Sequence, residues 1–190
     1  SKTKFIVINS PNNPTGKVLG KEELLEIVSL VRENKNLNII SDEIYELILD
    51  KNFQHFSLAA LGNDIKDRIF TVNGFAKGWA MTGWRIGYLV GQKEVIKASA
   101  SLQSQTTSNV CSFVQKGAIE ALKLDNDYFK KINDDYNQKR ELLFKGLQRI
   151  NGVHLDKPNG AFYAFPKLPN KTINSVDFCK MIIDDFGLVV

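Results

Sequence analysis

The chain has 190 residues, of which 43% are hydrophobic and 24% are charged, and its formal net charge is +4. This is the composition of an ordinary globular protein that buries one sizeable core or two small ones, which excludes a disordered chain. The charges are spread along the sequence without a block of like charges, so nothing favours nucleic-acid binding. No apolar run approaches the roughly eighteen residues that a membrane span needs, so we expect no membrane contact.

The cysteines and histidines are too scattered to predict a metal site. Cys111 and Cys179 are far apart and lack CxxC or Cys/His spacing, and His55 and His154 are isolated. Structural zinc sites take their ligands in closely spaced pairs. We therefore expect reduced thiols in a cytoplasmic protein that holds no metal.

The first predicted strand is Phe5 to Ile8, a continuous apolar run that is typical of a sheet covered on both faces. It leads into SPNNPTG, residues 10–16, where two prolines and a glycine prevent regular pairing. Open α/β sheets bind ligands at loops of this kind, beyond the carboxyl ends of the strands. An NPTG sequence alone is more often a plain turn.

A crossover helix and a second strand follow. Lys21 to Asn34 carries a one-sided apolar stripe, which predicts an amphipathic helix lying on the sheet, and Leu37 to Ser41 is the next strand. The order strand, helix, strand favours parallel pairing. Asp42 then emerges at the strand's end with Tyr45 three residues later, a spacing that one helical turn brings to the same side. An N-cap role for Asp42 explains the spacing equally well.

The stretch from Ile69 to Gly91 contains two apolar runs of strand character, Ile69 to Val72 and Ile86 to Val90, around a glycine-rich segment. Only two cations, Lys77 and Arg85, lie in that segment, among several aromatic residues. Partial desolvation by aromatic rings favours the neutral amine that forms Schiff bases with carbonyls. The guanidinium fork of an arginine suits a phosphate. Taken alone, a lysine near a strand end is more often a solvated loop charge.

The remaining segments are mostly helical. The pattern is broken within the first helical stretch by a polar segment, Thr106 to Ser112, which is either a loop or a polar helix face. Gly152 is a stop signal after the longest helix. The predicted elements are helical Lys93–Lys123, a long helix Tyr128–Ile150, a strand within Pro158–Pro166, a helix Val176–Phe186 and the beginning of a strand at Gly187–Val190.

Three motifs give the chain a family resemblance. AKGWAMTGWRIGY (residues 76–88), SPNNPTG (10–16) and DEIY (42–45) resemble the signatures of the fold-type I, pyridoxal-phosphate-dependent aminotransferases of class I/II, the aspartate aminotransferase family. The resemblance implies an α/β fold made of part of the large domain, a mostly parallel sheet with helices on both faces, and part of the small α+β domain. The implied domains are residues 1–125, the C-terminal part of the cofactor-binding domain, and residues 126–190, the linking helix with an incomplete small domain.

The resemblance also implies a set of cofactor contacts. Lys77 matches the lysine that holds pyridoxal 5'-phosphate as an internal aldimine, and Arg85 matches the arginine on its phosphate. Asp42 matches the acid that pairs with the protonated pyridine nitrogen. Asn13 and Tyr45 match the two donors to the ring's phenolic oxygen. These roles are chemically consistent, because a carboxylate beside the pyridine nitrogen helps the ring accept electrons and a released lysine amine can move a proton.

Two details qualify the match. In the family the bond that follows the matching asparagine is cis, so we expect a cis Asn13–Pro14 bond. Many family members have a hydroxyl residue three positions before the lysine, and this chain has Gly74 there. A hydrogen bond to the phosphate is therefore either missing or supplied by backbone.

The expected activity is transfer of an amino group between an amino acid and a 2-oxo acid, with aspartate and 2-oxoglutarate favoured because the signatures most resemble the aspartate branch. A lyase on the same scaffold and a non-catalytic aminotransferase-like domain remain alternatives. The family's substrate-binding arginine and glycine-rich phosphate loop have no match in this chain. We therefore expect a fragment that binds the cofactor weakly and does not transaminate alone, from a protein that is a homodimer at full length.

Overall fold

The computed structural model describes residues 2–168 and 173–190. Its centre is a four-stranded sheet in the order β1 (Phe5–Asn9), β2 (Asn38–Asp42), β3 (Ile69–Gly74), β4 (Gly87–Val90). The first three strands are parallel, and β4 pairs antiparallel with β3. The predicted α/β class and mostly parallel sheet are confirmed.

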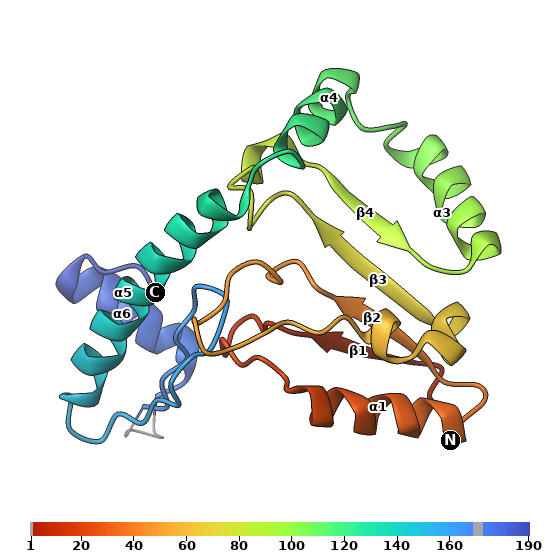
Figure 1. Ribbon diagram of the computed structural model, residues 1–190. Coiled ribbons are helices and arrows are strands. Elements are labelled where there is room, and N and C mark those ends of the chain that lie inside the picture. Colours follow the sequence, from red (N-terminus) through yellow and green to blue (C-terminus); the bar gives the residue numbers. More distant parts are fainter. Residues whose placement is uncertain (1, 169–172) are drawn as a thin grey trace.

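One face of the sheet carries the main hydrophobic core. The crossover helix α1 (Lys21–Glu33) lies along β1 and β2, and the short helices α2 (Leu58–Leu61) and η1 (Asn63–Arg68) lead into β3 (Figure 1). Helix α1 buries the apolar stripe that its sequence predicted, and the stripe packs against alternate strand residues. The buried members of this cluster are Leu24, Val28, Val31, Leu37, Ile39, Leu58, Ile65 and Ile69.

The prediction that β1 is covered on both faces is wrong for this chain. Ile6 and Ile8 pack against the α1 core, whereas Phe5 is 50% exposed and Val7 is 66% exposed on the opposite face. A continuous apolar run reports that the side chains favour burial, but it does not say which segment covers them. The helices that pack on the sheet here, α1 and α2, cover the first face.

Helices dominate after the sheet. The polar interruption at residues 107–111 is a loop between α3 (Lys93–Thr106) and α4 (Ser112–Ala121), which settles the choice that the sequence left open. Helix α5 (Asn126–Gln148) begins where the Asp125 side chain accepts a hydrogen bond from the Tyr128 amide, and it leads away from the sheet (Figure 1). The final helix is α6 (Ser175–Phe186).

Two strand predictions near the C-terminus are wrong. The segment 158–166 forms only an isolated bridge, between Gly160 and Leu49, and residues 187–190 have no regular structure. The amides of Asn159 and Gly160 both donate to the carbonyl of Gly16, so their hydrogen bonds go to a loop and not to a ladder. Ala161 has a φ of +52°, which turns the chain and ends the extended conformation.

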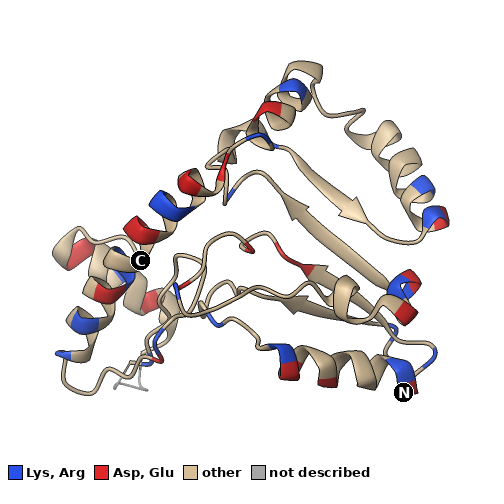
Figure 2. Ribbon diagram, in the orientation of Figure 1, with Lys and Arg blue, Asp and Glu red and all other residues tan. Residues whose placement is uncertain are grey.

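Charged residues of both signs are interspersed along the helices and loops (Figure 2). Within the part of the chain that the structure describes, no helix is both long enough and apolar enough to cross a membrane.

Candidate active site

The predicted site residues follow three neighbouring parallel strands, so they meet at one edge of the sheet. Asp42 is the last residue of β2. Its carbonyl accepts hydrogen bonds from the Ser10 amide at 3.3 Å and the Asn9 side chain at 3.2 Å, which fixes the loop after β1 against the end of β2. The loop after β3 carries Lys77. This is the edge at which open α/β sheets bind ligands.

The loop after β1 is shaped by asparagine side chains. The Asn9 side-chain oxygen accepts the Asn13 amide at 2.7 Å, and the Asn12 side-chain oxygen accepts the Thr15 amide at 3.1 Å. The Asn13–Pro14 bond is cis, as expected from the resemblance. The Ser10–Pro11 bond is also cis, which the sequence did not predict.

Tyr45 lies in a turn and not in a helix. The Glu46 amide donates to the Glu43 carbonyl at 2.9 Å, and among the described residues the Asp42 carboxylate accepts only the Ile44 amide, at a long 3.3 Å. The Asp42 side chain therefore does not cap a helix, and its carboxylate keeps most of its acceptor capacity.

The Tyr45 phenol is buried and surrounded by polar groups. Burial raises the pKa of this phenol, and its hydrogen bond to Tyr163 and the nearby Asp42 carboxylate raise that pKa further. A hydrogen bond from the Asn13 side chain acts in the opposite direction. Asn13, Asp42 and Tyr45 are thus brought together, and the phenol keeps its proton and can donate it in a hydrogen bond.

Lys77 completes this group. Its Nζ lies 5.5 Å from the centre of the Tyr45 ring and 5.3 Å from the centre of the Phe162 ring. No ion pair within residues 2–168 and 173–190 involves Lys77 or Asp42. The amine is therefore held beside aromatic ring faces and is not paired with a described carboxylate.

Arg85 lies on the same loop but is not brought into contact with the other four. It follows the short helix η2 (Thr82–Trp84), has a φ of +53°, and donates to the Thr82 carbonyl at 3.0 Å. Its side chain is exposed. The pairing of Gly74 with Gly87 closes the loop from residue 75 to residue 86, so Arg85 stays at the same edge of the sheet as Lys77.

The backbone explains the glycine at position 74. A Cβ atom there would lie 2.8 Å from the Gly87 Cα and 2.9 Å from the Ile86 carbonyl oxygen. Both contacts are shorter than real Cβ atoms make, and both involve backbone that cannot rotate away. This close approach of β4 excludes a side-chain hydroxyl at position 74.

Sequence reasoning missed an aromatic group that surrounds Tyr45. The Phe162 ring is edge-on to the Tyr45 ring at 5.3 Å, and the Tyr163 hydroxyl lies 2.5 Å from the Tyr45 hydroxyl. Tyr136 of α5 stacks on Phe162 at 5.7 Å. Tyr163 is 118 residues from Tyr45 in the chain. No local pattern reports such a contact, so the sequence held no signal for it.

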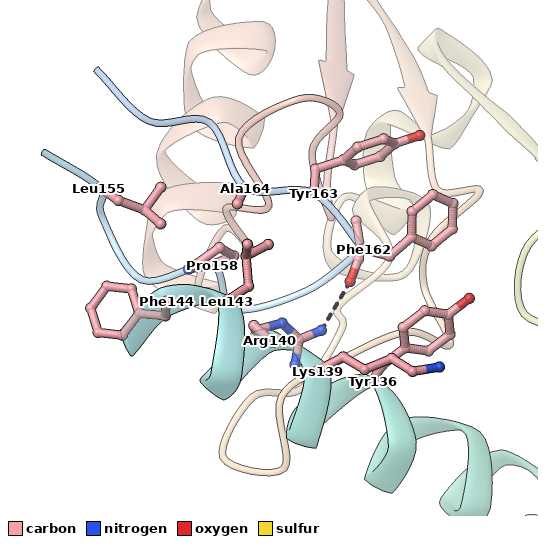
Figure 3. Close-up of a pocket in the computed structure, with 11 residues that line it drawn as sticks. Tyr136, Lys139, Arg140, Leu143, Phe144, Leu155, Pro158, Phe162, Tyr163 and Ala164 are labelled. Atoms are coloured by element: carbon pink, nitrogen blue, oxygen red, sulfur yellow. Dashed lines mark hydrogen bonds between the residues drawn. The ribbon is translucent and has the colours of Figure 1, made fainter. Parts of the chain in front are cut away.

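A cavity of about 130 Å³ lies behind this aromatic group, between α5 and residues 155–164 (Figure 3). Arg140 lines it, is 7% exposed, and donates through Nη2 to the Ala161 carbonyl at 2.9 Å. Burial lowers the pKa of this guanidinium, although the Asp50 carboxylate acts in the opposite direction. Arg140 thus fastens the 158–164 segment to α5.

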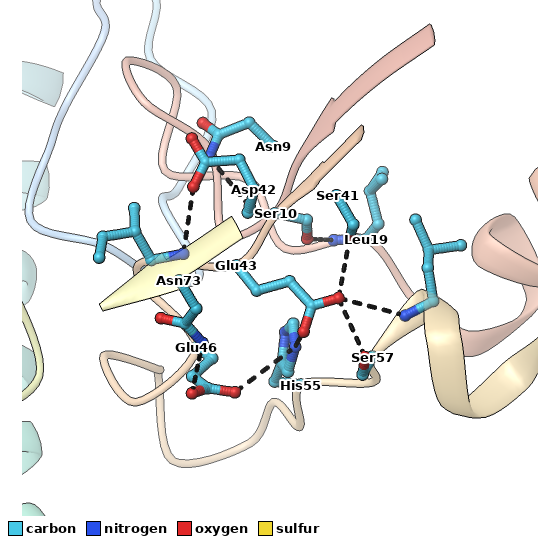
Figure 4. A network of polar contacts seen from close by, with 12 residues as sticks. Asn9, Ser10, Leu19, Ser41, Asp42, Glu43, Glu46, His55, Ser57 and Asn73 are labelled. Atoms are coloured by element: carbon cyan, nitrogen blue, oxygen red, sulfur yellow. Dashed lines mark hydrogen bonds and ion pairs between the residues drawn. The ribbon is translucent and has the colours of Figure 1, made fainter. Parts of the chain in front are cut away.

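Sequence reasoning also missed a buried polar network beneath the Asp42–Tyr45 turn. The Glu43 carboxylate accepts hydrogen bonds from Ser41, at 2.8 Å, and Ser57, at 3.0 Å, and lies 3.2 Å from His55 Nε2. Figure 4 shows it pointing away from the Asp42 carboxylate. Burial alone would raise the pKa of Glu43, but these hydrogen bonds outweigh burial and hold the pKa below its ordinary value. The sequence signal for this network was Glu43, an acidic residue that directly follows β2.

Glu46 extends the network toward β3. Its Oε1 accepts the Asn73 side chain at 2.6 Å, and its Oε2 lies 4.0 Å from His55 Nε2. Burial raises the pKa of the Glu46 carboxyl, and the Asn73 hydrogen bond only partly offsets that rise. The network joins the 43–46 turn to the 55–57 loop and to β3, so it fixes the turn that carries Tyr45.

The fold defines an open α/β protein whose candidate site lies at the carboxyl ends of its strands. Comparison with known proteins identifies its family. The family model "Aminotransferase class I and II" matches residues 1–190, and the chain therefore belongs to the class I and II aminotransferases.

The relatives are named aminotransferases. A probable aspartate/prephenate aminotransferase of Rickettsia felis is 43% identical and matches 100% of this chain but 49% of its own length. The solved aspartate aminotransferase of Rhizobium meliloti superposes with a TM-score of 0.93 at 32% identity, over 100% of this chain and 50% of its own. The aromatic aminotransferase of Pyrococcus horikoshii OT3 gives 0.91 at 36% identity, with the same coverage. The chain spans about half the length of the curated relatives it matches first.

Proposed function

We propose that this chain carries the cofactor lysine and ring contacts of an aminotransferase that moves an amino group between an amino acid, aspartate first, and a 2-oxo acid. The family match and the names of the relatives support the reaction class. The observation that carries the proposal is the convergence of Asn13, Asp42, Tyr45 and Lys77 at one edge of the sheet. The four residues lie at or just beyond the ends of three strands that are distant in sequence.

The residues fit pyridoxal 5'-phosphate by their chemistry. The Asp42 carboxylate has no cationic partner within the described residues and can pair with a protonated pyridine nitrogen. The Lys77 amine lies beside aromatic faces, where an imine bond to an aldehyde can form. When bound, the cofactor supplies that aldehyde and an electron-accepting ring.

Each residue then has a defined task. Asp42 keeps the ring nitrogen protonated, and Asn13 and Tyr45 donate to the ring's phenolic oxygen. Lys77 would hold the cofactor, and its amine, when free, would be the group that moves a proton to and from the substrate's α-carbon. Arg85, whose side chain is exposed at the same edge of the sheet, would bind the phosphate with its planar fork.

The glycine at position 74 means that no side-chain hydroxyl there can bind the cofactor phosphate. A side chain at that position would collide with β4, and the amides of Gly74 and Phe75 already donate to the Asn73 side chain and the Ile86 carbonyl. We therefore propose that backbone amides of residues 76–78 supply the hydrogen bond that a hydroxyl gives in other members. Successive backbone amides in a turn beyond a strand end suit an anion.

Further parts of the proposal concern the whole protein. We propose that residues 1–125 belong to the cofactor-binding domain, that 126–190 are the linking helix and part of the small domain, and that the full-length protein is a homodimer. The cytoplasmic location and the inactivity of this chain alone stay predictions. Substrate choice is tested on the protein at the full length its gene encodes, by comparing turnover of aspartate and phenylalanine with 2-oxoglutarate.

The test of cofactor binding is a spectrum. Pyridoxal 5'-phosphate is added to the purified chain, to Lys77→Ala, and to Lys97→Ala, a control that removes an exposed lysine of α3. We expect the visible absorption of an imine in the first and third proteins and not in the second. Equal absorption in all three would mean that the cofactor reacts with surface amines, and the proposed role of Lys77 would be wrong.

A further inference from the structure

Tyr163 makes the closest polar contact of Tyr45. The two hydroxyl oxygens are 2.5 Å apart, and the rings are edge-on at 5.6 Å with an interplanar angle of 82°. Tyr45 is 3% exposed, so water has little access to this pair. A phenol has one proton to donate and can accept another hydrogen bond, which makes the direction of the pair chemically significant.

Tyr163 is held in place by three separate segments. The Ala161 amide donates to the Ile48 carbonyl at 2.9 Å, and the Ala161 carbonyl accepts Arg140 of α5, also at 2.9 Å (Figure 3). The Gly160 amide donates to the Gly16 carbonyl at 2.9 Å, next to the loop that carries Asn13. The Tyr163 hydroxyl is thus presented to Tyr45 by the loops of the site itself and by α5.

The chemistry assigns each hydroxyl a direction. Without the cofactor the Tyr45 proton can point at Tyr163, and this contact raises the Tyr45 pKa. In the proposed function the Tyr45 proton points at the ring's phenolic oxygen instead, so the Tyr45 oxygen then accepts from Tyr163. We propose that Tyr163 is a positioning residue of this site: its hydroxyl donates to the Tyr45 oxygen and directs the Tyr45 proton at the cofactor ring. This inference rests on the proposed function and adds a residue to it from the other end of the chain.

The consequence is a chain of two hydrogen bonds that strengthen one another. A donor behind Tyr45 polarises its O–H bond, and each link in such a chain gains roughly 10–30% in strength. The ring's phenolic oxygen then carries its negative charge more stably and holds the neighbouring imine proton less tightly. Removing the Tyr163 hydroxyl should therefore let the imine keep its proton to a higher pH.

The test is a pH titration of the visible absorption of the Lys77-bound cofactor. In Tyr163→Phe, which keeps the ring, we expect the midpoint to rise by about half a pH unit. Tyr45→Phe should raise it more, and the double variant should match Tyr45→Phe, because Tyr163 acts only through Tyr45. Tyr136→Phe is the matched control: its ring stacks on Phe162, and its hydroxyl makes no hydrogen bond to a described residue.

A second variant separates the effect of the Tyr163 hydrogen bond from the effect of lost packing at position 163. Incorporating 3-fluorotyrosine at position 163 keeps the shape and strengthens the donor, so the midpoint should fall below that of the unmodified protein. Unchanged midpoints in both variants, or equal and additive shifts in the double variant, would overturn the inference. Absence of the visible band in the unmodified protein would instead overturn the proposed function, so the two failures are distinguishable.

Discussion

Replacing Glu43 tests whether the buried network beneath the turn holds the site edge together. Its carboxylate accepts from Ser41, Ser57 and the Leu58 amide and lies against His55, and the Glu43 side chain is 4% exposed. Glu43→Ala removes the carboxylate and therefore all of these contacts at once. Glu43→Gln keeps one oxygen for the first three donors and removes the negative charge.

The alanine variant should be strongly destabilised. It leaves the Ser41 hydroxyl and the Leu58 amide without an acceptor, and these residues are 3% and 1% exposed. Each buried donor left unsatisfied costs about 1–3 kcal/mol, so the free energy of unfolding should fall by about 2–6 kcal/mol. At about 2–4 °C per kcal/mol for a chain of this size, a loss of ~4 kcal/mol lowers Tm by roughly 8–16 °C.

The glutamine variant gives the pH dependence of the same interaction. The folded-state pKa of Glu43 is depressed, because the hydrogen bonds from His55, Ser41 and Ser57 outweigh burial. A depressed carboxyl pKa contributes stability that is fully present above the unfolded value of about 4.3 and is lost as pH falls through the folded value. The stability gap between the unmodified protein and Glu43→Gln should be constant near neutral pH and should close below about pH 4.

The assay is urea unfolding followed by circular dichroism, at pH 7 and in steps down to pH 3. Glu26→Ala, an exposed position on α1 that forms no ion pair with a described residue, is the control and should change stability by less than about 0.5 kcal/mol. An unfolding free energy for Glu43→Ala within that margin of the unmodified protein would refute the reasoning, since no buried donor could then depend on the carboxylate.

Three other substitutions follow from the packing. Gly74→Ser, which restores the family's hydroxyl, should lower stability by about 1–3 kcal/mol because β4 leaves no room for a Cβ; a neutral effect in thermal unfolding would show that the strands can separate. Gly146→Ala, with nothing within 4 Å of the added Cβ on α5, should raise stability by about 0.5–1 kcal/mol, and a loss would contradict the helix assignment. Asn133→Ala should cost about 1–3 kcal/mol, because the Leu49 amide and the Leu47 carbonyl both lose their partner; protection of the Leu49 amide from hydrogen exchange that matches the unmodified protein would disprove this.

The strands and helices around the sheet edge could be predicted because their signals are local. The apolar run of β1, the stripe of α1 and the apolar start of β3 each lie within one element, and the observed bounds differ from the predicted ones by one or two residues. Polar residues predicted the break between α3 and α4. Whether the break is a loop or a polar helix face depends on packing, which the sequence does not show.

The strand expected at 158–166 shows where local patterning fails. Its apolar and aromatic residues after a turn are typical of a strand, yet its amides pair with the carbonyls of Gly16 and Ile48, in loops that precede it by more than a hundred residues. The same distance hid the hydroxyl pair of Tyr45 and Tyr163. Loop-to-loop contacts of this kind are set by the assembled sheet and leave no periodic trace in the sequence.

The motifs indicated the site more directly than the physical patterns did. Spacing alone left Asp42 as a possible helix cap and Lys77 as a solvated charge. In the fold, Asp42 lies at the end of a central strand with a carboxylate that forms no ion pair with a described residue, and Lys77 lies over two aromatic rings. The structure supports the predicted role of Arg85 least. The motif predicts a phosphate contact, but the Arg85 side chain is exposed and donates a hydrogen bond to the Thr82 carbonyl of its own loop.

Reduction with borohydride tests the central idea most directly, because it turns a reversible imine into a permanent label. The protein is incubated with pyridoxal 5'-phosphate, reduced, digested and mapped by mass spectrometry. A single phosphopyridoxyl group on the peptide that contains Lys77 is the predicted result. A label scattered over exposed lysines, or an unlabelled Lys77, would show that the loops at this sheet edge do not form a cofactor site.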